Sequence, residues 1–464
     1  MKMTFKYLSH LLMAVLCGTL LTACTINIPP ADEYSDPDAI SGLKQARSLL
    51  ASTYALYPHC EFELSVMGED FMPTNYTNKD ISKQNLYSWK DSEITTMAEN
   101  LWLQFYNTIA SCNTLLERVE KIEVTNDNDK FSKTAIISEA KTLKALCYFK
   151  LLQLYAPAYD RNPQADGIIL TDKVGLKFPK RSSIATCTDS IRALLTQATG
   201  VNNVPTANGW LSRKAAIYLQ AEVELYAENY SKAVQLAEDI IKDCSTDMFT
   251  QGGIESLWTT TSNKNRIFAF YNDGSYYTSI QFGAANGDYF AVNPNISFTP
   301  EDHRTSSYVL TFNMDGTPRT LLGKYNKNLK AGTDNRYIDM MRPAGAYFIA
   351  AESYAQLGQN AKAISTINAY LNAVKATPLT ETLTGETLID AILQEKQKEF
   401  VGEGQGFLDL KRLHKRSIHR GSAFNKGIIS TIKADDYRWT FPIPRSEYRY
   451  NENVTQNEGW PLNR

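Results

Sequence analysis

The chain has 464 residues, of which 43% are hydrophobic and 21% are charged, and its formal net charge is -2. This balance is typical of a folded protein, and it argues against a basic surface for nucleic acid or for an anionic membrane. The length would permit two or three domains. Tyr, Phe and Trp number 26, 19 and 6, which suits either a recognition surface or crowded helical packing.

The N-terminus has the pattern of an export signal. Two lysines precede an apolar run from Leu11 to Leu21, which is too short to span a bilayer comfortably and suits the core of a signal peptide. Small residues then precede Cys24, in a sequence that resembles the lipobox of bacterial lipoproteins. We expect residues 1–23 to be a signal peptide, Cys24 to carry acyl chains, and residues 24–38 to be a tether. The alternative is an unrelated cysteine after a cleavable signal.

The cysteines beyond this anchor do not form a metal or disulfide pattern. Cys60, Cys112, Cys147, Cys187 and Cys244 are five, an odd number, so they cannot all pair within the chain. Cys112 and Cys147 stand in apolar helical runs, where a free thiol acts as a small hydrophobic group. The sequence has no CxxC and no cluster of Cys with His, so we expect no zinc site.

Helical periodicity follows the tether. We expect residues 39–464 to form one domain, with a helical scaffold over about 39–57, 93–250 and 343–413 and a C-terminal segment over 414–464. Ser183 lies just before one predicted helix and can cap its free amide groups. Apolar residues at helical spacing predict the first four helices at Leu43 to Tyr54, Met97 to Val119, Thr134 to Tyr155 and Thr188 to Thr199.

Two later stretches read as helical hairpins. The first runs from Ser212 to Ile241 and turns at Asn229 and Tyr230. The second, from Ala344 to Val374, has small and aromatic residues at tetratricopeptide-repeat spacing. We expect four hairpins, which pair residues in the 40s with the 100s, the 140s with the 190s, the 210s with the 230s and the 350s with the 370s. The predicted fold is mainly α, an irregular superhelix of tetratricopeptide-like hairpins.

Two regions lack helical periodicity, at about 58–92 and 251–342. Both mix Gly, Pro and Asn with aromatic residues, and we expect loop-rich, partly β structure, with short strands at Ile267 to Tyr271 and Val309 to Phe312. A long irregular segment in a compact domain is usually functional or disordered, and the aromatic residues argue against disorder. We therefore expect the ligand-binding surface here.

The stretch from Glu395 to Leu413, hereafter the signature stretch, joins a predicted helix to an apolar and charged cluster. Gly402, Gly404 and Gly406 separate the two parts, and glycine adopts the left-handed conformation of a helix cap at low cost. Since buried charges are usually paired, we interpret the charged residues as pairing with one another or with backbone. The residues concerned are Glu399, Glu403, Asp409 and Arg412.

The signature stretch also resembles the SusD/RagB family of outer-membrane nutrient-uptake lipoproteins. Gly402 and Gly406 depart from the family pattern, which has a larger residue at the first position and Arg at the second. Further resemblances lie in Trp102 to Asn113, in the helix before Pro157, in Asp302-His-Arg304 and in the C-terminal Pro-Ile-Pro and Thr-Gln-Asn segments. The positions of the signature stretch that match are Glu395, Glu399, Glu403, Gly404, Gln405, Phe407, Asp409, Leu410, Lys411 and Arg412.

The resemblance implies a helical-hairpin scaffold whose loops bind nutrient and face a SusC-like TonB-dependent channel, which the lipoprotein covers like a lid. It also implies an outer-membrane location with the protein facing the cell exterior. No family motif fixes the binding residues, so the candidates rest on residue type and loop position, because aromatic rings stack on sugar rings and polar side chains bind hydroxyl groups. They are Asn75, Tyr76, Trp89, Trp258, Tyr276, Tyr277, Asp288 and Tyr289.

Three functions remain open from the sequence. The first is binding of oligosaccharide for delivery to the channel, the second is the same role for peptides, and the third is a helical scaffold that binds only protein. We expect no enzymatic activity, since no nucleophile elbow, HExxH, P-loop or dinucleotide motif stands in a fitting context. No cofactor is predicted; a structural calcium ion would draw on Asp70, Asp273 and Asp288, although no EF-hand spacing occurs.

Overall fold

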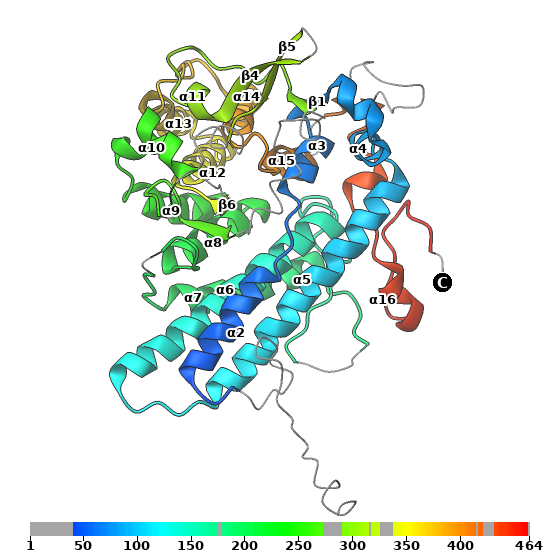
Figure 1. Cartoon of the computed structure of the whole chain (residues 1–464), viewed down its shortest axis with the longest axis vertical. Coiled ribbons are helices and arrows are strands. Elements are labelled where there is room, and N and C mark those ends of the chain that lie inside the picture. Colours follow the sequence, from blue (N-terminus) through cyan, green and yellow to red (C-terminus); the bar gives the residue numbers. More distant parts are fainter. Residues whose placement is uncertain are drawn as a thin grey trace, which may run out of the picture.

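The computed structural model describes most of the chain after residue 39, and the statements below concern that part. It is mainly helical, with the helices in the N-terminal half and near the C-terminus and short strands between them (Figure 1). The described residues are 40–173, 178–205, 207–258, 260, 262–271, 290–314, 317–324, 337–413, 416–420 and 431–462.

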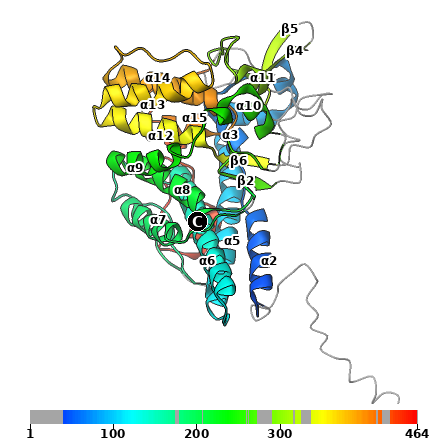
Figure 2. The same cartoon turned by 90° about the vertical axis from the view of Figure 1, so that its left-hand side faces the viewer.

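Four helical hairpins make the scaffold, and all four predicted pairings are confirmed by the contacts between helices. Successive hairpins also contact each other, through α5 with α6, α7 with α8 and α9 with α12, so the hairpins stack into a superhelix (Figure 2). The pairs are α2 (Leu43–Ala55) with α5 (Asp91–Glu120), α6 (Asp127–Tyr155) with α7 (Ile184–Thr199), α8 (Arg213–Tyr226) with α9 (Tyr230–Ile241), and α12 (Pro343–Gln356) with α13 (Asn360–Ala373).

Polar caps fix where these helices begin. The Ser183 side chain accepts a hydrogen bond from Thr186 N and starts α7, as the sequence predicts. Asn126 accepts from Asp129 N in the same way, so α6 begins at Asp127 and not near Thr134. Periodicity alone misses this first part of α6 because its residues are polar and exposed.

The C-terminal end of α6 is a meeting point of distant parts of the chain. Lys411 Nζ donates to the carbonyl oxygens of Gln153 and Leu154, at 2.6 and 3.1 Å. The Tyr155 carbonyl accepts from Arg181 at 3.1 Å and from Asn457 at 2.8 Å. The last carbonyls of a helix have no partner within it, so these contacts satisfy them and bind the C-terminal segment to the scaffold.

The signature stretch forms α14 (Gly385–Glu399) and α15 (Gln405–Leu413), which meet at a tight turn. Gly402 and Gly404 have φ of 81° and 76°, so both adopt the left-handed conformation that favours glycine. Gly406 does not; it lies inside the first turn of α15, which corrects its expected role as a third helix stop. α15 packs against α3 (Glu61–Met67).

The region over 58–92 is not the irregular loop that the sequence indicates. Besides α3 it contains a short strand and two further helical turns, and much of it is buried. Its helices are too short, and in α3 too buried on every side, to show an amphipathic period. The additional elements are β1 (Phe71–Pro73), the 3-10 helix η2 (Asn75–Lys79) and α4 (Ile81–Tyr87).

The described parts of the region over 251–342 confirm the two expected strands, near 268 and near 309. They also contain short helices, α10 (Gln251–Leu257) and α11 (Thr305–Tyr308), after the 3-10 helix η3 (Thr246–Phe249). Four antiparallel pairs of strands occur in the described residues: β1 with β3 (Phe290–Val292), β2 (Phe268–Tyr271) with β6 (Tyr337–Met341), β4 (Val309–Met314) with β5 (Thr317–Leu322), and β7 (Ile418–His419) with β8 (Thr431–Ile432).

The hydrophobic core is shared by all four hairpins, and the described cysteines are free. One hydrophobic cluster extends from Ile40 to Trp460 and includes residues of every hairpin. Cys60, Cys112, Cys147 and Cys187 are buried free thiols and Cys244 is a half-buried one. In the part of the chain that the structure describes, no helix combines the length and the apolar character needed to cross a membrane.

Candidate functional site

The two regions expected to face the ligand meet at the β1–β3 pair. Phe71 lies opposite Val292 and Pro73 opposite Phe290, which joins segments more than two hundred residues apart in the sequence. The Asn293 amide continues the contact by donating to the Asp70 carbonyl at 2.8 Å, and β5 packs against β3. The loops that leave this strand pair therefore start from one place, which we call the β1–β3 face.

Tyr76 lies at this face on η2. The Thr74 side chain caps η2 by accepting from Tyr76 N at 3.2 Å, and Asn75 is the first residue of the helical turn. The half-buried Tyr76 ring packs against Ala291 and Leu321, and the Lys79 ammonium group lies 4.6 Å from the ring centroid. Tyr76 is thus held in place while part of its side chain remains exposed.

Both candidate tryptophans in the described residues are core residues. Trp89 is completely buried, donates from Nε1 to the Met67 carbonyl at 2.9 Å, and packs edge-on against Trp439. Trp258 is 2% exposed and lies against Tyr308. Neither indole has a face free for a sugar ring in this structure, and this corrects the expected stacking role of both.

The remaining candidates lie outside the described residues. These are the lipidation site Cys24, the ligand-binding candidates Tyr276, Tyr277, Asp288 and Tyr289, and the candidate calcium ligand Asp273.

Asp70, the described member of the calcium candidates, binds protein groups. It is 1% exposed, and its carboxylate accepts from Gly402 N at 3.0 Å and from the Gln397 side chain at 3.3 Å. Burial raises its pKa to about 6, against the effect of these hydrogen bonds. Among the described residues, no group of three or more His, Cys, Asp or Glu side chains is placed to hold a metal ion.

Tyr271 is a further candidate for ligand binding that was not predicted from the sequence. Its ring is 59% exposed at the end of β2 and packs edge-on against Tyr337, with 5.9 Å between centroids. The signal in the sequence is a tyrosine between an apolar strand pattern and Asn-Asp-Gly, a tripeptide whose composition is typical of turns. The side chain of an aromatic residue at the end of a strand often points away from the core, although its backbone still belongs to the strand.

The first pair of signature carboxylates binds cations from the region over 302–342. The Arg342 guanidinium contacts the Glu399 carboxylate and lies 2.8 Å from Glu403 Oε1. Lys324 Nζ donates to Glu403 Oε1 at 2.6 Å. Burial acts to raise the pKa of Glu399, but Arg342 and Arg304 outweigh it and hold that pKa below its ordinary value. These carboxylates are paired as expected, but not with Asp409 or Arg412.

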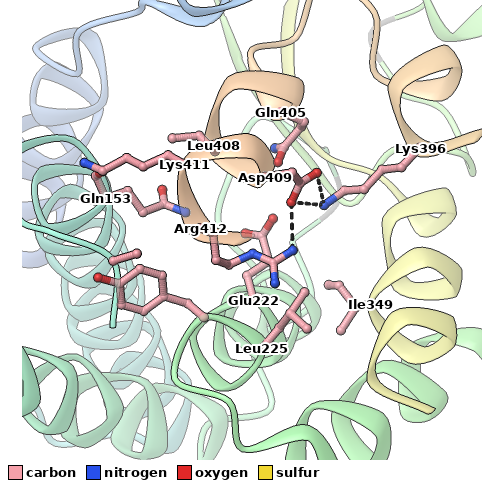
Figure 3. Close-up of a pocket in the computed structure, with 12 residues that line it drawn as sticks. Gln153, Glu222, Leu225, Ile349, Lys396, Gln405, Leu408, Asp409, Lys411 and Arg412 are labelled. Atoms are coloured by element: carbon pink, nitrogen blue, oxygen red, sulfur yellow. Dashed lines mark hydrogen bonds and ion pairs between the residues drawn. The ribbon is translucent and has the colours of Figure 1, made fainter. Parts of the chain in front are cut away.

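The second pair, Asp409 and Arg412, does interact, at 3.0 Å (Figure 3). Arg412 also forms two hydrogen bonds with Glu352 of α12, at 2.6 and 2.9 Å, and Asp409 lies 2.8 Å from Lys396 Nζ. The interpretation that Asp409 and Arg412 pair with each other is therefore confirmed. Together the two clusters bind α14 and α15 to α12 and to the strands, which is a structural role.

A small cavity of about 40 Å³ lies beneath α15, with Gln405 at its wall and Glu222 of α8 directed into it (Figure 3). A space of this size accommodates a few water molecules and no sugar ring. Burial raises the pKa of Glu222 to about 7. Burial also lowers the pKa of Lys411 well below its ordinary value, and the charge of Arg161 adds to this.

Two family models together match most of the chain. Residues 196–460 match the model described as "SusD family", and residues 32–225 match the model described as "Starch-binding associating with outer membrane". A SusD-like protein of Formosa agariphila is 22% identical over 485 residues, which cover 89% of this chain and 92% of the relative.

Solved structures show the same fold at low sequence identity. A SusD-like carbohydrate binding protein from Bacteroides vulgatus superposes with a TM-score of 0.73 at 19% identity, over 89% of this chain and 97% of its own. A SusD superfamily protein from Bacteroides thetaiotaomicron gives 0.74 at 22% identity, over 90% and 99%. The superhelix and its inserted strands are therefore shared with proteins that differ in four residues of every five.

Proposed function

The chain belongs to the SusD family, a family of non-catalytic binding proteins, and from this premise we propose that it binds an oligosaccharide at the surface of the outer membrane and passes it to a partner SusC-like TonB-dependent channel. In this proposal residues 1–23 are a signal peptide, Cys24 carries the lipid anchor, residues 24–38 are the tether, and residues 39–464 form one domain. The protein faces the cell exterior.

The observation that carries the proposal is the β1–β3 face. It joins the two aromatic-rich regions and holds Tyr76 partly exposed on a capped turn. A tyrosine of this kind offers an apolar ring to the C–H face of a sugar and a hydroxyl group to its polar edge. Asn75, Tyr276, Tyr277, Asp288 and Tyr289 are the further proposed ligand residues. The name of the carbohydrate-binding neighbour from Bacteroides vulgatus supports the same ligand class.

Calorimetry tests the ligand class. The purified protein is titrated with a panel of neutral plant and host oligosaccharides and with a mixture of peptides. We expect one class of oligosaccharide to bind, and Tyr76→Ala to weaken that binding about tenfold, the effect of losing about 1.4 kcal/mol. Tyr450→Ala is the matched control, because Tyr450 is 69% exposed on α16 (Arg445–Tyr450), outside the face.

The alternatives give different results in the same experiment. Heat from peptides and none from sugars would replace oligosaccharide by peptide as the ligand. The absence of heat from both would favour a scaffold that binds only protein.

Delivery to a channel is tested separately by isolating the protein from outer membranes in mild detergent. We expect a TonB-dependent channel to co-purify. A Cys24→Ser variant should no longer fractionate with membranes, because acyl chains supply about 0.8 kcal/mol for each buried methylene. Recovery of the wild-type protein without any channel would contradict the proposed role as a lid.

A further inference from the structure

A second groove, distinct from the β1–β3 face, lies beside α8 and α9. It is bounded by the start of α8, the C-terminal half of α9, the segment over 262–267 that leads into β2, and the described residues of the loop over 202–212, which are 202–205 and 207–212. Its volume is about 810 Å³, which falls within the range of about 300–1,000 Å³ found for small-molecule sites. None of the residues of the β1–β3 face named above lines it.

Trp210 forms a rigid wall of this groove. The half-buried indole packs edge-on against Tyr54, with 5.4 Å between centroids and an angle of 83° between planes. The Arg47 guanidinium lies 5.1 Å from the ring centroid and is itself held by two hydrogen bonds to Glu139, at 2.8 and 2.9 Å. A ring fixed in this way loses little conformational entropy when a ligand packs on it.

Amide side chains fix part of the rim. Asn208 Oδ1 accepts from Asn263 N at 2.9 Å, and Asn208 Nδ2 donates to the Arg266 carbonyl at 2.8 Å. Asn263 Nδ2 in turn donates to Ser256 Oγ at 2.9 Å. These bonds join the loop over 202–212 to the segment over 262–267, so the rim is formed before any ligand arrives. Asn202 lies on the same rim with its side chain exposed.

Two of the lysines around the groove are paired with carboxylates, and Arg213 is held by a backbone carbonyl. Lys214 pairs with Asp243 at 2.7 Å, and Lys264 pairs with Asp247 at 3.4 Å. Arg213 Nε donates to the Thr199 carbonyl at 2.7 Å. A polyanion would have to compete with these pairs, whereas a neutral ligand would leave them intact.

We propose that this groove is a second glycan-binding site, which takes a neutral oligosaccharide with one sugar ring against Trp210 and its hydroxyl groups toward the amide-bearing rim. The half-buried Ile217 adds an apolar side chain to the lining. The class of ligand in this inference rests on the proposed function, whereas the location of the site rests on the groove itself. A second site would let the protein hold one long chain at two points or retain a second chain nearby.

The test follows Trp210 directly in the full chain labelled with 5-fluorotryptophan. The fluorine signal of Trp210 is assigned with the Trp210→Phe variant, and the labelled protein is titrated with maltoheptaose, cellohexaose, xylohexaose and laminarihexaose. We expect at least one of these neutral sugars to shift the Trp210 signal saturably, with an affinity that changes less than twofold between low and high salt.

Three variants separate this groove from the β1–β3 face. Asn202→Tyr places a ring across an exposed part of the rim and should weaken the Trp210 response at least tenfold. Asn372→Tyr, the same change at an exposed position of α13 away from the groove, should leave the response unchanged. Tyr76→Ala should also leave it unchanged, because Tyr76 belongs to the other face.

Four results would overturn the inference. If sugars bind by calorimetry but never shift the Trp210 signal, or if Tyr76→Ala abolishes that shift, the groove is not a second site and the proposed function stands. If no sugar binds by either method, the inference and the oligosaccharide function both fail. A Trp210 shift caused only by peptides would also overturn the assignment to sugars.

Discussion

The environment of the Glu222 side chain favours its protonated form. Its side chain enters the small cavity beneath α15, near Asp409, and burial raises its pKa to about 7. In the unfolded chain the pKa of a glutamate side chain is about 4.3. The folded state therefore binds this proton more tightly, and the free energy of unfolding should fall as pH rises between these two values.

The Glu222→Gln variant tests the direction of this pH dependence. The variant keeps the shape of the side chain and removes the charge, so it should resemble the wild type at pH 4.5 and be more stable by about 3 kcal/mol at pH 8. Urea unfolding of both proteins at the two pH values measures the difference. An equal effect of the substitution at both values would show that Glu222 does not titrate in this range.

Arg342 is the cation on which the first pair of signature carboxylates depends. It is completely buried between Glu399 and Glu403. Arg342→Ala should lower the free energy of unfolding by about 3–5 kcal/mol, because it leaves buried charge without its partner. Lys242→Ala removes an exposed pair with Asp239 and should cost less than about 1 kcal/mol. Chemical denaturation compares the two, and equal losses would contradict the argument.

The sequence predicts that Glu399 and Glu403 are paired, but it does not identify their partners. Burial of charged residues demands partners, and the sequence indicates that much. The cationic partners, Arg304, Lys324 and Arg342, lie at least 57 residues away in the sequence, in segments that flank α11, β5 and β6. No local pattern links such positions, whereas Asp409 and Arg412 stand one helical turn apart and could be paired from spacing alone.

At the scale of elements, α8 and α12 approach more closely than a larger residue would allow. A Cβ on Gly345 of α12 would lie 1.9 Å from Tyr218 Oη on α8. Gly345→Ala should therefore destabilise the protein by about 2–3 kcal/mol, as overpacking of a core does. Tyr218→Phe removes the atom in closest contact, so the double variant should recover part of the loss in a double-mutant cycle. Strictly additive effects would rule out this contact as the cause.

Helices with a clear period were predictable, and short buried helices were not. The eight scaffold helices show apolar residues at helical spacing, and the sequence places all of them. In α3 six of the seven residues are buried, so no polar face marks it as a helix. For the same reason Trp89 was expected on an exposed loop, because it lies between α4, which the sequence does not reveal, and the start of α5.

The whole molecule depends on its C-terminal segment. Asn457 Nδ2 donates to the Tyr155 carbonyl at the end of α6 and to the Phe441 carbonyl, at 2.8 and 2.7 Å. Asn457→Ala should lower the free energy of unfolding by about 1–3 kcal/mol, since a buried hydrogen-bonding group loses its partner. Asn453→Ala, which removes an exposed bond to the Phe178 carbonyl, should change it by less than about 0.5 kcal/mol. Thermal and urea unfolding measure both, and similar losses would contradict the role of Asn457.

Fold class follows from the sequence at this scale, but the location of the proposed ligand face does not. Two of the hairpins, α8 with α9 and α12 with α13, join neighbouring helices through short turns, and apolar periodicity identifies the helices of all four. The β1–β3 pair joins residues 71 and 292, and each strand has three residues, too few for a pattern. Composition could indicate which regions contain the face, but only the folded chain shows that they meet.

The end of α6 also has a consequence for the order of synthesis and folding. Its carbonyl groups are satisfied by Lys411 and Asn457, which the ribosome adds about three hundred residues after α6 itself. In a chain that is made from the N-terminus, these carbonyl groups lack their partners until nearly the last residue is available. Under the export that we propose for residues 1–23, the end of α6 therefore acquires these contacts only after the C-terminal segment has crossed the membrane.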